Sequence, residues 1–156
     1  MTCIRQIIEA SPERIYQAFT NSAELVAWLP PGKMTGRIHS FDLREGGGYS
    51  ISLFYPPDEK EMRGKTTEHE DRVQVRFVEL SHPHRIVEAV RFVTTDPALL
   101  GEMRMIINLV PVVGGGTEVV MFFEDLPAGM RPEDNAEGAR LSLKQLASHV
   151  ANSQTN

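Results

Sequence analysis

One glutamate in the middle of the chain is the strongest candidate for chemistry. Glu88 alternates with Val90 and Phe92, so an extended strand places its carboxyl on the same face as these apolar side chains. A carboxyl in apolar surroundings must be paired or hydrated, or its pKa rises. Such a group could orient a ligand hydroxyl or act as a general acid or base. Alternatively, Glu88 reaches solvent at a strand end or pairs with Arg76 or Arg104.

Glu79 is a second acidic candidate. It alternates with Phe77, so a regular strand would place its carboxyl on the same inner face as that of Glu88. The two carboxyls could then form an acid/base pair, although nothing in the sequence fixes the distance between them. The alternative is that Glu79 is a polar residue near the edge of a sheet.

Other residue types that often carry chemistry lack the pattern that the chemistry needs. His82 and His84 are two residues apart, but no third ligand lies at a spacing that forces convergence, so we predict no metal and no cofactor. The serines lack a nucleophile-elbow context. The glycine runs at 46–48 and 114–116 lie between predicted strands, which indicates hairpin turns and not phosphate loops. We assign no catalytic residue.

Composition and charge exclude several classes of protein. The 156 residues carry a net charge of −5, and the basic residues are scattered, which argues against nucleic-acid binding and attraction to anionic membranes. No apolar run approaches the length of a membrane span, and the N-terminus lacks a signal-peptide pattern. The single cysteine, Cys3, excludes an internal disulfide. We therefore expect a cytoplasmic protein with one domain over residues 1–156.

The order of predicted elements indicates an α+β fold. Ser11, Pro12 and Glu13 mark the start of a short helix after a first strand, and Asn21 with Glu24 resembles a capping box for a second. A long amphipathic helix is predicted from Pro132 to about residue 151. Pro56 to Glu61 predicts a mobile loop. The remaining strands are expected at 38–43, 49–55, 72–80, 85–93, 103–109 and 117–124.

These elements predict a curved antiparallel sheet of about six or seven strands, wrapped around the C-terminal helix with a hollow between the two. Strand alternation and the helix stripe indicate which side chains face that hollow. Three methionines among them favour a wall that adapts to guests of varied shape. The predicted ligand-binding residues are Trp28, Tyr49, Ile51, Leu53, Glu79, Glu88, Val90, Phe92, Met103, Met105, Met121, Phe123 and Leu143.

Several segments of the chain form a recognisable set in this order: 11–19, 42–48, 77–80, 83–87, 115–119 and the last helix with Gly138, Leu143 and Leu146. In these segments the chain resembles the activator-of-heat-shock-protein-ATPase-like branch of the START and pollen-allergen superfamily, also called SRPBCC, from about Ile4 to Val150. The resemblance implies a helix-grip fold with an internal cavity for an apolar or amphipathic molecule. Many relatives carry a Gly-Trp pair early in the last helix, whereas Ala139 follows Gly138 here, which implies a differently shaped cavity.

Three functions follow from these observations. The first is a small-molecule-binding protein for a lipid-like or aromatic ligand, which the architecture and the lack of a catalytic constellation favour. The second is a cavity enzyme of the cyclase, aromatase or hydrolase type that uses Glu88 or Glu79. The third is a co-chaperone-like module that activates a chaperone ATPase, which rests on family analogy alone. A homodimer is compatible with the sequence, although no feature argues for one.

Overall fold

A computed structural model describes residues 2–58, 64–67 and 69–154 of the chain. It contains seven strands, three α-helices and one short 3₁₀ helix. Their bounds, in chain order, are β1 (Thr2–Ile8), α1 (Pro12–Phe19), α2 (Ser22–Trp28), β2 (Thr35–Asp42), β3 (Gly48–Phe54), β4 (Glu70–Ser81), β5 (Arg85–Phe92), η1 (Pro97–Leu99), β6 (Met103–Pro111), β7 (Thr117–Glu124) and α3 (Pro132–Gln154).

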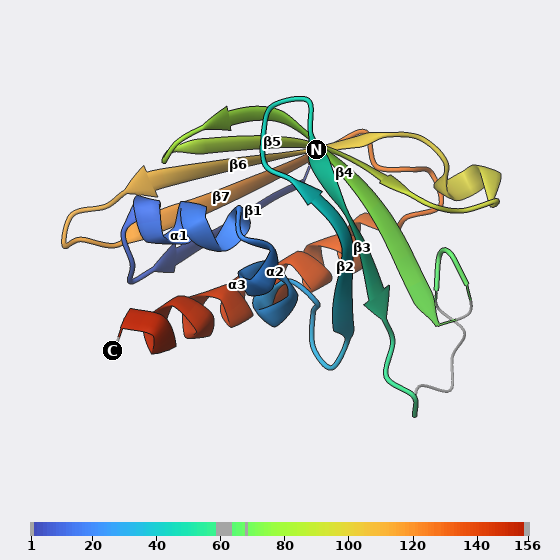
Figure 1. Cartoon of the computed structure of the whole chain (residues 1–156), viewed down its shortest axis with the longest axis horizontal. Coiled ribbons are helices and arrows are strands. Elements are labelled where there is room, and N and C mark those ends of the chain that lie inside the picture. The colour runs from blue at the N-terminus through green and yellow to red at the C-terminus, as the bar shows by residue number, and fades with distance from the viewer. Residues whose placement is uncertain (1, 59–63, 68, 155–156) are drawn as a thin grey trace.

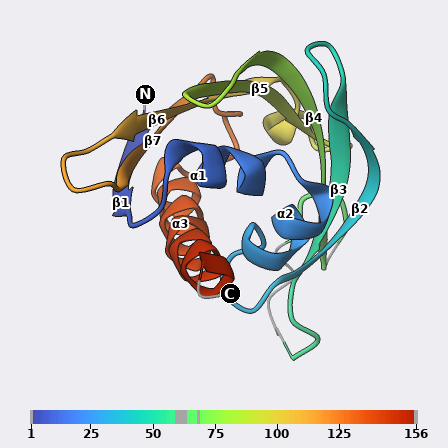
Figure 2. The same cartoon turned by 60° about the vertical axis from the view of Figure 1, so that its left-hand side comes forward.

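The seven strands form one antiparallel sheet in the order β1-β7-β6-β5-β4-β3-β2. The sheet is strongly curved, and α1, α2 and α3 all lie within its curve (Figures 1 and 2). The predicted α+β helix-grip architecture is therefore confirmed, including the two short helices after the first strand. None of the described helices has the length and apolarity to cross a membrane.

The two short helices begin where their capping residues predict. The Ser11 hydroxyl accepts a hydrogen bond from the Arg14 amide (3.1 Å), and the Asn21 side chain accepts one from the Glu24 amide (3.0 Å). Trp28 is fully buried at the end of α2, where its indole N–H donates to the Ala18 carbonyl (3.0 Å). These contacts fix the corner between α1 and α2.

The glycine run at 46–48 makes the predicted turn between β2 and β3. Gly46 has a φ of 85°, a conformation that glycine adopts without steric cost. Gly48 opens β3 opposite Arg76 of β4, and a Cβ on Gly48 would overlap the Val75 carbonyl oxygen. The two strands can therefore approach each other here only because residue 48 has no side chain. Of the loop predicted at 56–61, residues 59–61 lie outside the described residues.

A set of polar contacts, here called the α2–α3 clasp, holds α3 against the end of α2 and the segment that follows it. The Gln145 amide donates to the carbonyls of Trp28 (2.7 Å) and Pro30 (2.8 Å), and its oxygen accepts from the Gly32 amide (2.8 Å). The Ser142 hydroxyl donates to the Leu29 carbonyl (2.7 Å). Two α3 side chains thus satisfy backbone groups that the end of α2 leaves without helical partners.

A second part of the α2–α3 clasp is ionic. The Glu24 carboxylate of α2 is 2.8 Å from the His149 imidazole of α3 and 2.8 Å from the Arg14 guanidinium of α1. Gln17 also donates to this carboxylate (2.9 Å). Burial opposes ionisation, but the hydrogen bonds from these three side chains prevail and lower the pKa of Glu24. One carboxylate therefore joins all three α-helices.

We predict opposite effects from adding a methyl group at two glycines. Gly48→Ala should lower the free energy of unfolding by about 2 kcal/mol or more, because the new Cβ overlaps the β4 backbone. Gly138→Ala in α3 should raise it by up to about 1 kcal/mol, because its Cβ meets no atom within 4 Å and alanine favours the helix. Urea denaturation of both variants measures the two changes. Equal stability of the two variants would contradict this account.

Candidate functional site

Glu88 lies at the centre of the inner face of the sheet. It is opposite Phe77 on β4 and Met105 on β6, so apolar side chains from both neighbouring strands flank it. Only 1% of the residue is exposed, and its buried Oε1 atom has no hydrogen-bond partner among the described residues. The inward direction predicted for Glu88 is therefore confirmed, whereas a position open to solvent is wrong.

The alternative that Glu88 pairs with an arginine is also wrong. Arg76 and Arg104 are both opposite Ala89, the residue after Glu88, so their side chains leave the opposite face of the sheet. Arg76 pairs there with Glu102, at 3.2 Å. The sheet itself separates these guanidinium groups from the buried carboxyl.

The electrostatic state of Glu88 follows from its burial. Removal from water raises the pKa of Glu88 to about 8, because the protein interior disfavours the charged form. The carboxyl is therefore mostly protonated at neutral pH. Burial, with a smaller effect from Glu88 when it is ionised, raises the pKa of Tyr49 well above its usual value. Glu88 and Tyr49 thus bring two neutral hydroxyl-bearing side chains into one apolar interior at neutral pH.

The ring of Tyr49 is held by other aromatic residues. Its centroid lies 5.7 Å from that of Phe41 and 5.7 Å from that of Phe77. Such offset and tilted ring contacts favour one orientation of the side chain. Because Phe77 is also opposite Glu88, the aromatic cluster and the buried carboxyl share a wall of the interior.

Most of the apolar residues predicted to bind a ligand do lie in the core. Leu53, Phe92 and Met105 are partly buried and pack against it. The inward position of the predicted apolar residues is established, while their role in ligand binding stays a prediction. The buried members of the predicted set are Trp28, Tyr49, Ile51, Val90, Met103, Met121, Phe123 and Leu143.

Glu79 does not lie with Glu88, and the prediction of a second inner carboxyl is wrong. The β4–β5 register shifts between Phe77 and Glu79, so the extra residue reverses the alternation and Leu80 packs against the core instead. The Glu79 carboxylate accepts from the Ser81 hydroxyl (2.7 Å) and pairs with Arg85 (3.2 Å). These hydrogen bonds lower the pKa of Glu79. The bulge thus separates the two predicted members of an acid/base pair.

The sequence analysis missed a second buried carboxylate, Asp71, near the start of β4. It is 5% exposed, and Lys65 donates to it from its ammonium (2.9 Å) and its backbone amide (2.6 Å). The Tyr55 hydroxyl donates as well, at 3.0 Å. The alternation of Asp71 with the buried Val73 could have indicated this inward position. Unlike Glu88, Asp71 has several partners, which assigns it a structural role.

A serine, a histidine and a glutamate also meet on β2, β3 and β4, but not in the order of a catalytic triad. The Ser52 hydroxyl donates to the Glu70 carboxylate, so the His39 imidazole, at 2.8 Å, must donate to the serine oxygen. A nucleophilic serine needs the reverse, with histidine accepting its proton. This chain of hydrogen bonds therefore ties three strands together and does not activate Ser52.

The predicted turn histidines do not converge on a metal position. His82 packs edge-on against the Tyr16 ring, with the centroids 4.7 Å apart, and the His84 imidazole lies 3.4 Å from the Leu109 carbonyl. Among the described residues, no three side chains of the His, Cys, Asp and Glu types gather to form a metal site. Packing around the β4–β5 turn accounts for both residues.

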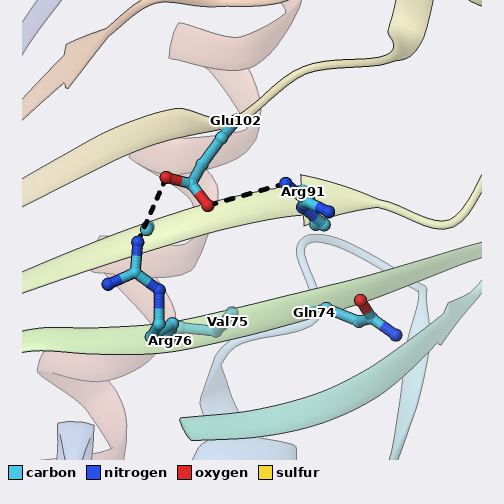
Figure 3. Close-up of a pocket in the computed structure, with 6 residues that line it drawn as sticks. Gln74, Val75, Arg76, Arg91 and Glu102 are labelled. Carbon is cyan, nitrogen blue, oxygen red and sulfur yellow. Dashed lines mark hydrogen bonds and ion pairs between the residues drawn. The ribbon is translucent and has the colours of Figure 1, made fainter. Parts of the chain in front are cut away.

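Two hollows lie on the surface, away from the predicted ligand-binding residues. One, of about 340 Å³, lies on the convex face, where Glu102 pairs with Arg76 (3.2 Å) and Arg91 (3.8 Å), as Figure 3 shows. Glu102 already neutralises both guanidinium groups in part, so we assign no site there. The other, of about 420 Å³, lies beside α2 and α3, where Gln145 and His149 serve the α2–α3 clasp. The hollow between sheet and α3 stays a prediction.

The model of the family described as activator of Hsp90 ATPase homolog 1-like protein matches residues 9–151. The chain belongs to this family. The solved structure of protein CV1439 from Chromobacterium violaceum is 30% identical, with a TM-score of 0.82, over 96% of this chain and 95% of that one. Protein Mll3558 from Rhizobium loti is 25% identical, with a TM-score of 0.70 and coverages of 95% and 94%. No curated protein matches the sequence.

Membership of the Hsp90-ATPase-activator-like family supports a ligand-binding domain in general terms and specifies no ligand. A structure from Rhodobacter sphaeroides, 22% identical over 96% of this chain and 91% of that one, shares the fold at a TM-score of 0.73. The family therefore accounts for the sheet, the helices and their arrangement. The unpartnered carboxyl of Glu88 needs an explanation from this chain itself.

We predict that replacing Glu88 with glutamine changes how stability depends on pH. Between about pH 4.5 and pH 8, the unfolded chain releases the Glu88 proton while the folded chain keeps it, so rising pH destabilises the wild type through this group. Glu88→Gln removes that effect. Its stability relative to wild type should therefore increase by about 4 kcal/mol between pH 4.5 and pH 8, because titration is half complete at each end of this range and tenfold in proton affinity is about 1.4 kcal/mol.

Urea denaturation across this pH range measures the difference. Glu79→Gln is the matched control. This carboxylate pairs with Arg85 outside the interior, so its substitution should leave the pH dependence of stability that Glu88 causes unchanged. A pH-independent difference between wild type and Glu88→Gln would show that Glu88 titrates normally in the folded protein.

Proposed function

We propose that this chain is a small-molecule-binding protein. Its interior, between the concave face of the sheet and α3, takes up an apolar or amphipathic molecule of the lipid-like or aromatic kind. Family membership supports ligand binding in general, and the predominantly apolar inner face supports this class of molecule.

The observation that carries the proposal is the unpartnered Oε1 atom of Glu88. A buried polar group without a hydrogen bond costs about 1–3 kcal/mol, which an apolar side chain at the same position would avoid. A core that serves stability alone gains nothing from a carboxyl there. A bound molecule with a hydrogen-bond donor would supply the missing partner of this oxygen, and ligand binding would then account for a carboxyl at this position.

The methionine side chains of the inner face are suited to contact a small molecule. Met103, Met105 and Met121 are unbranched and polarisable, so their side chains can adapt to different shapes at small cost. Glu88 is 1% exposed, so the surrounding side chains close its carboxyl off from solvent. A ligand therefore enters only when side chains or helices of the wall move.

The two other functions receive less support. An acid/base pair of Glu79 and Glu88 does not form, because the β-bulge places the two carboxyls on opposite faces. Glu88 alone would have to supply both proton transfers of an enzyme mechanism. Activation of a chaperone ATPase rests on the family description alone. We therefore retain ligand binding as the conclusion.

We predict that the protein purified from its own host carries a stoichiometric small molecule. Native mass spectrometry should show a mass above that of the bare chain, and denaturation should release a compound with an apolar body. Adding that compound to ligand-free protein should raise the melting temperature, because binding to the folded state alone stabilises it.

The same compound should raise the melting temperature of Glu79→Gln as much as that of wild type, since Glu79 lies outside the interior. A clean ligand-free mass, together with no melting shift across a panel of lipids and aromatic compounds, would overturn the proposed function.

A further inference from the structure

The surroundings of Glu88 restrict the chemistry of a molecule that binds beside it. On the inner face, Phe77 and Met105 lie opposite it, and Ile86 and Val90 lie two residues away along β5. All four side chains are apolar. Apart from the Tyr49 hydroxyl, which shares this interior, the carboxyl is the only group among these neighbours that can bind the polar end of a ligand by a side-chain hydrogen bond.

The cations of the neighbouring strands do not reach this position. Arg76, Arg91 and Arg104 belong to the outer face, as their register and exposure show. Lys65 lies over the ring of Phe92 on the inner side, with its ammonium 5.1 Å from the ring centroid. Its ammonium is already paired with Asp71, at 2.9 Å. An anionic ligand end beside Glu88 would thus meet a carboxyl and no free cation from these strands.

A cationic ligand end is also disfavoured. It would require Glu88 to ionise and both charges to be buried among Phe77, Met105 and their apolar neighbours. Removing two charges from water costs more than their attraction returns unless further hydrogen bonds satisfy them. The apolar neighbours supply no such bonds. A neutral polar group loses far less hydration on entering the same place.

We propose that the ligand bears an uncharged hydroxyl or amide on an apolar body, and that Glu88 binds this group through hydrogen bonds. This inference rests on the proposed function. A protonated carboxyl donates one hydrogen bond and accepts others, and a hydroxyl or amide does the same, so the two groups complement each other. The Oε1 atom that has no partner in the ligand-free chain receives one on binding.

Three probes with the same eight-carbon alkyl chain test the inference: 1-octanol, octylamine and nonanoate. At pH 7 the first is neutral, the second is a cation and the third is an anion. Wild-type protein should bind 1-octanol about tenfold or more tightly than either charged probe, as measured by isothermal titration calorimetry. The apolar chain contributes equally to all three, so the difference isolates the polar end.

Two variants assign the preference to Glu88. Glu88→Leu should lose the preference, because the hydroxyl of octanol then enters the interior without a partner, and octanol affinity should fall about tenfold. Glu88→Gln should keep most of the preference for 1-octanol, since the side-chain amide also donates and accepts hydrogen bonds. Glu79→Gln should bind all three probes as wild type does, because that residue lies on the outer face.

Outcomes that overturn only this inference differ from those that also overturn the proposed function. Equal binding of the three probes, or a preference for octylamine or nonanoate, would overturn the inference and leave the proposed function standing. Unchanged octanol affinity in a folded Glu88→Leu variant would overturn it as well. Binding of none of the probes, in protein that also yields no released compound, would overturn the proposed function and the inference together.

Discussion

The closure of the sheet around α3 is the constraint on which the rest of the structure depends. A seven-stranded open sheet has two edges, β1 and β2, and an apolar inner face that must be kept from water. α3 packs along β1 at one edge, and at the other it reaches β2 through α2. The α2–α3 clasp completes the second connection with hydrogen bonds from Gln145 and Ser142 to the backbone after α2. The helices thereby close the curve that Figure 2 shows.

Closure gives the inner face the low polarity that makes Glu88 unusual. Asp71 is nearly as buried, yet Lys65 and Tyr55 donate hydrogen bonds to its carboxylate. Glu88 differs because its neighbours on three strands are apolar, so the neutral form of its carboxyl has the lower free energy at neutral pH. Two buried carboxyls on one face of one sheet therefore differ in their hydrogen-bond partners, a distinction that burial alone does not make.

The sequence predicted what depends on local pattern and failed where distant residues decide. Capping residues placed both short helices, and regular alternation placed Glu88 correctly because β5 runs without a bulge. The same rule failed for Glu79, because the register shift in β4 arises from pairing with β5. No residue type in β4 indicates this bulge in the sequence. The α2–α3 clasp joins residues more than a hundred positions apart, and Gln145 resembled an ordinary polar residue of an amphipathic helix.

An unsatisfied carboxyl in a closed interior links stability to binding. While the interior holds no ligand, Glu88 lowers the stability of the fold, most strongly above the pH at which the folded carboxyl would ionise. A ligand that donates to Oε1 removes part of that cost, so the carboxyl contributes more to the complex than to the free protein. An apolar side chain would stabilise both states alike and distinguish no polar end from another. Under the proposed function, the residue that weakens the core is therefore the one that would discriminate between ligands of equal apolar surface.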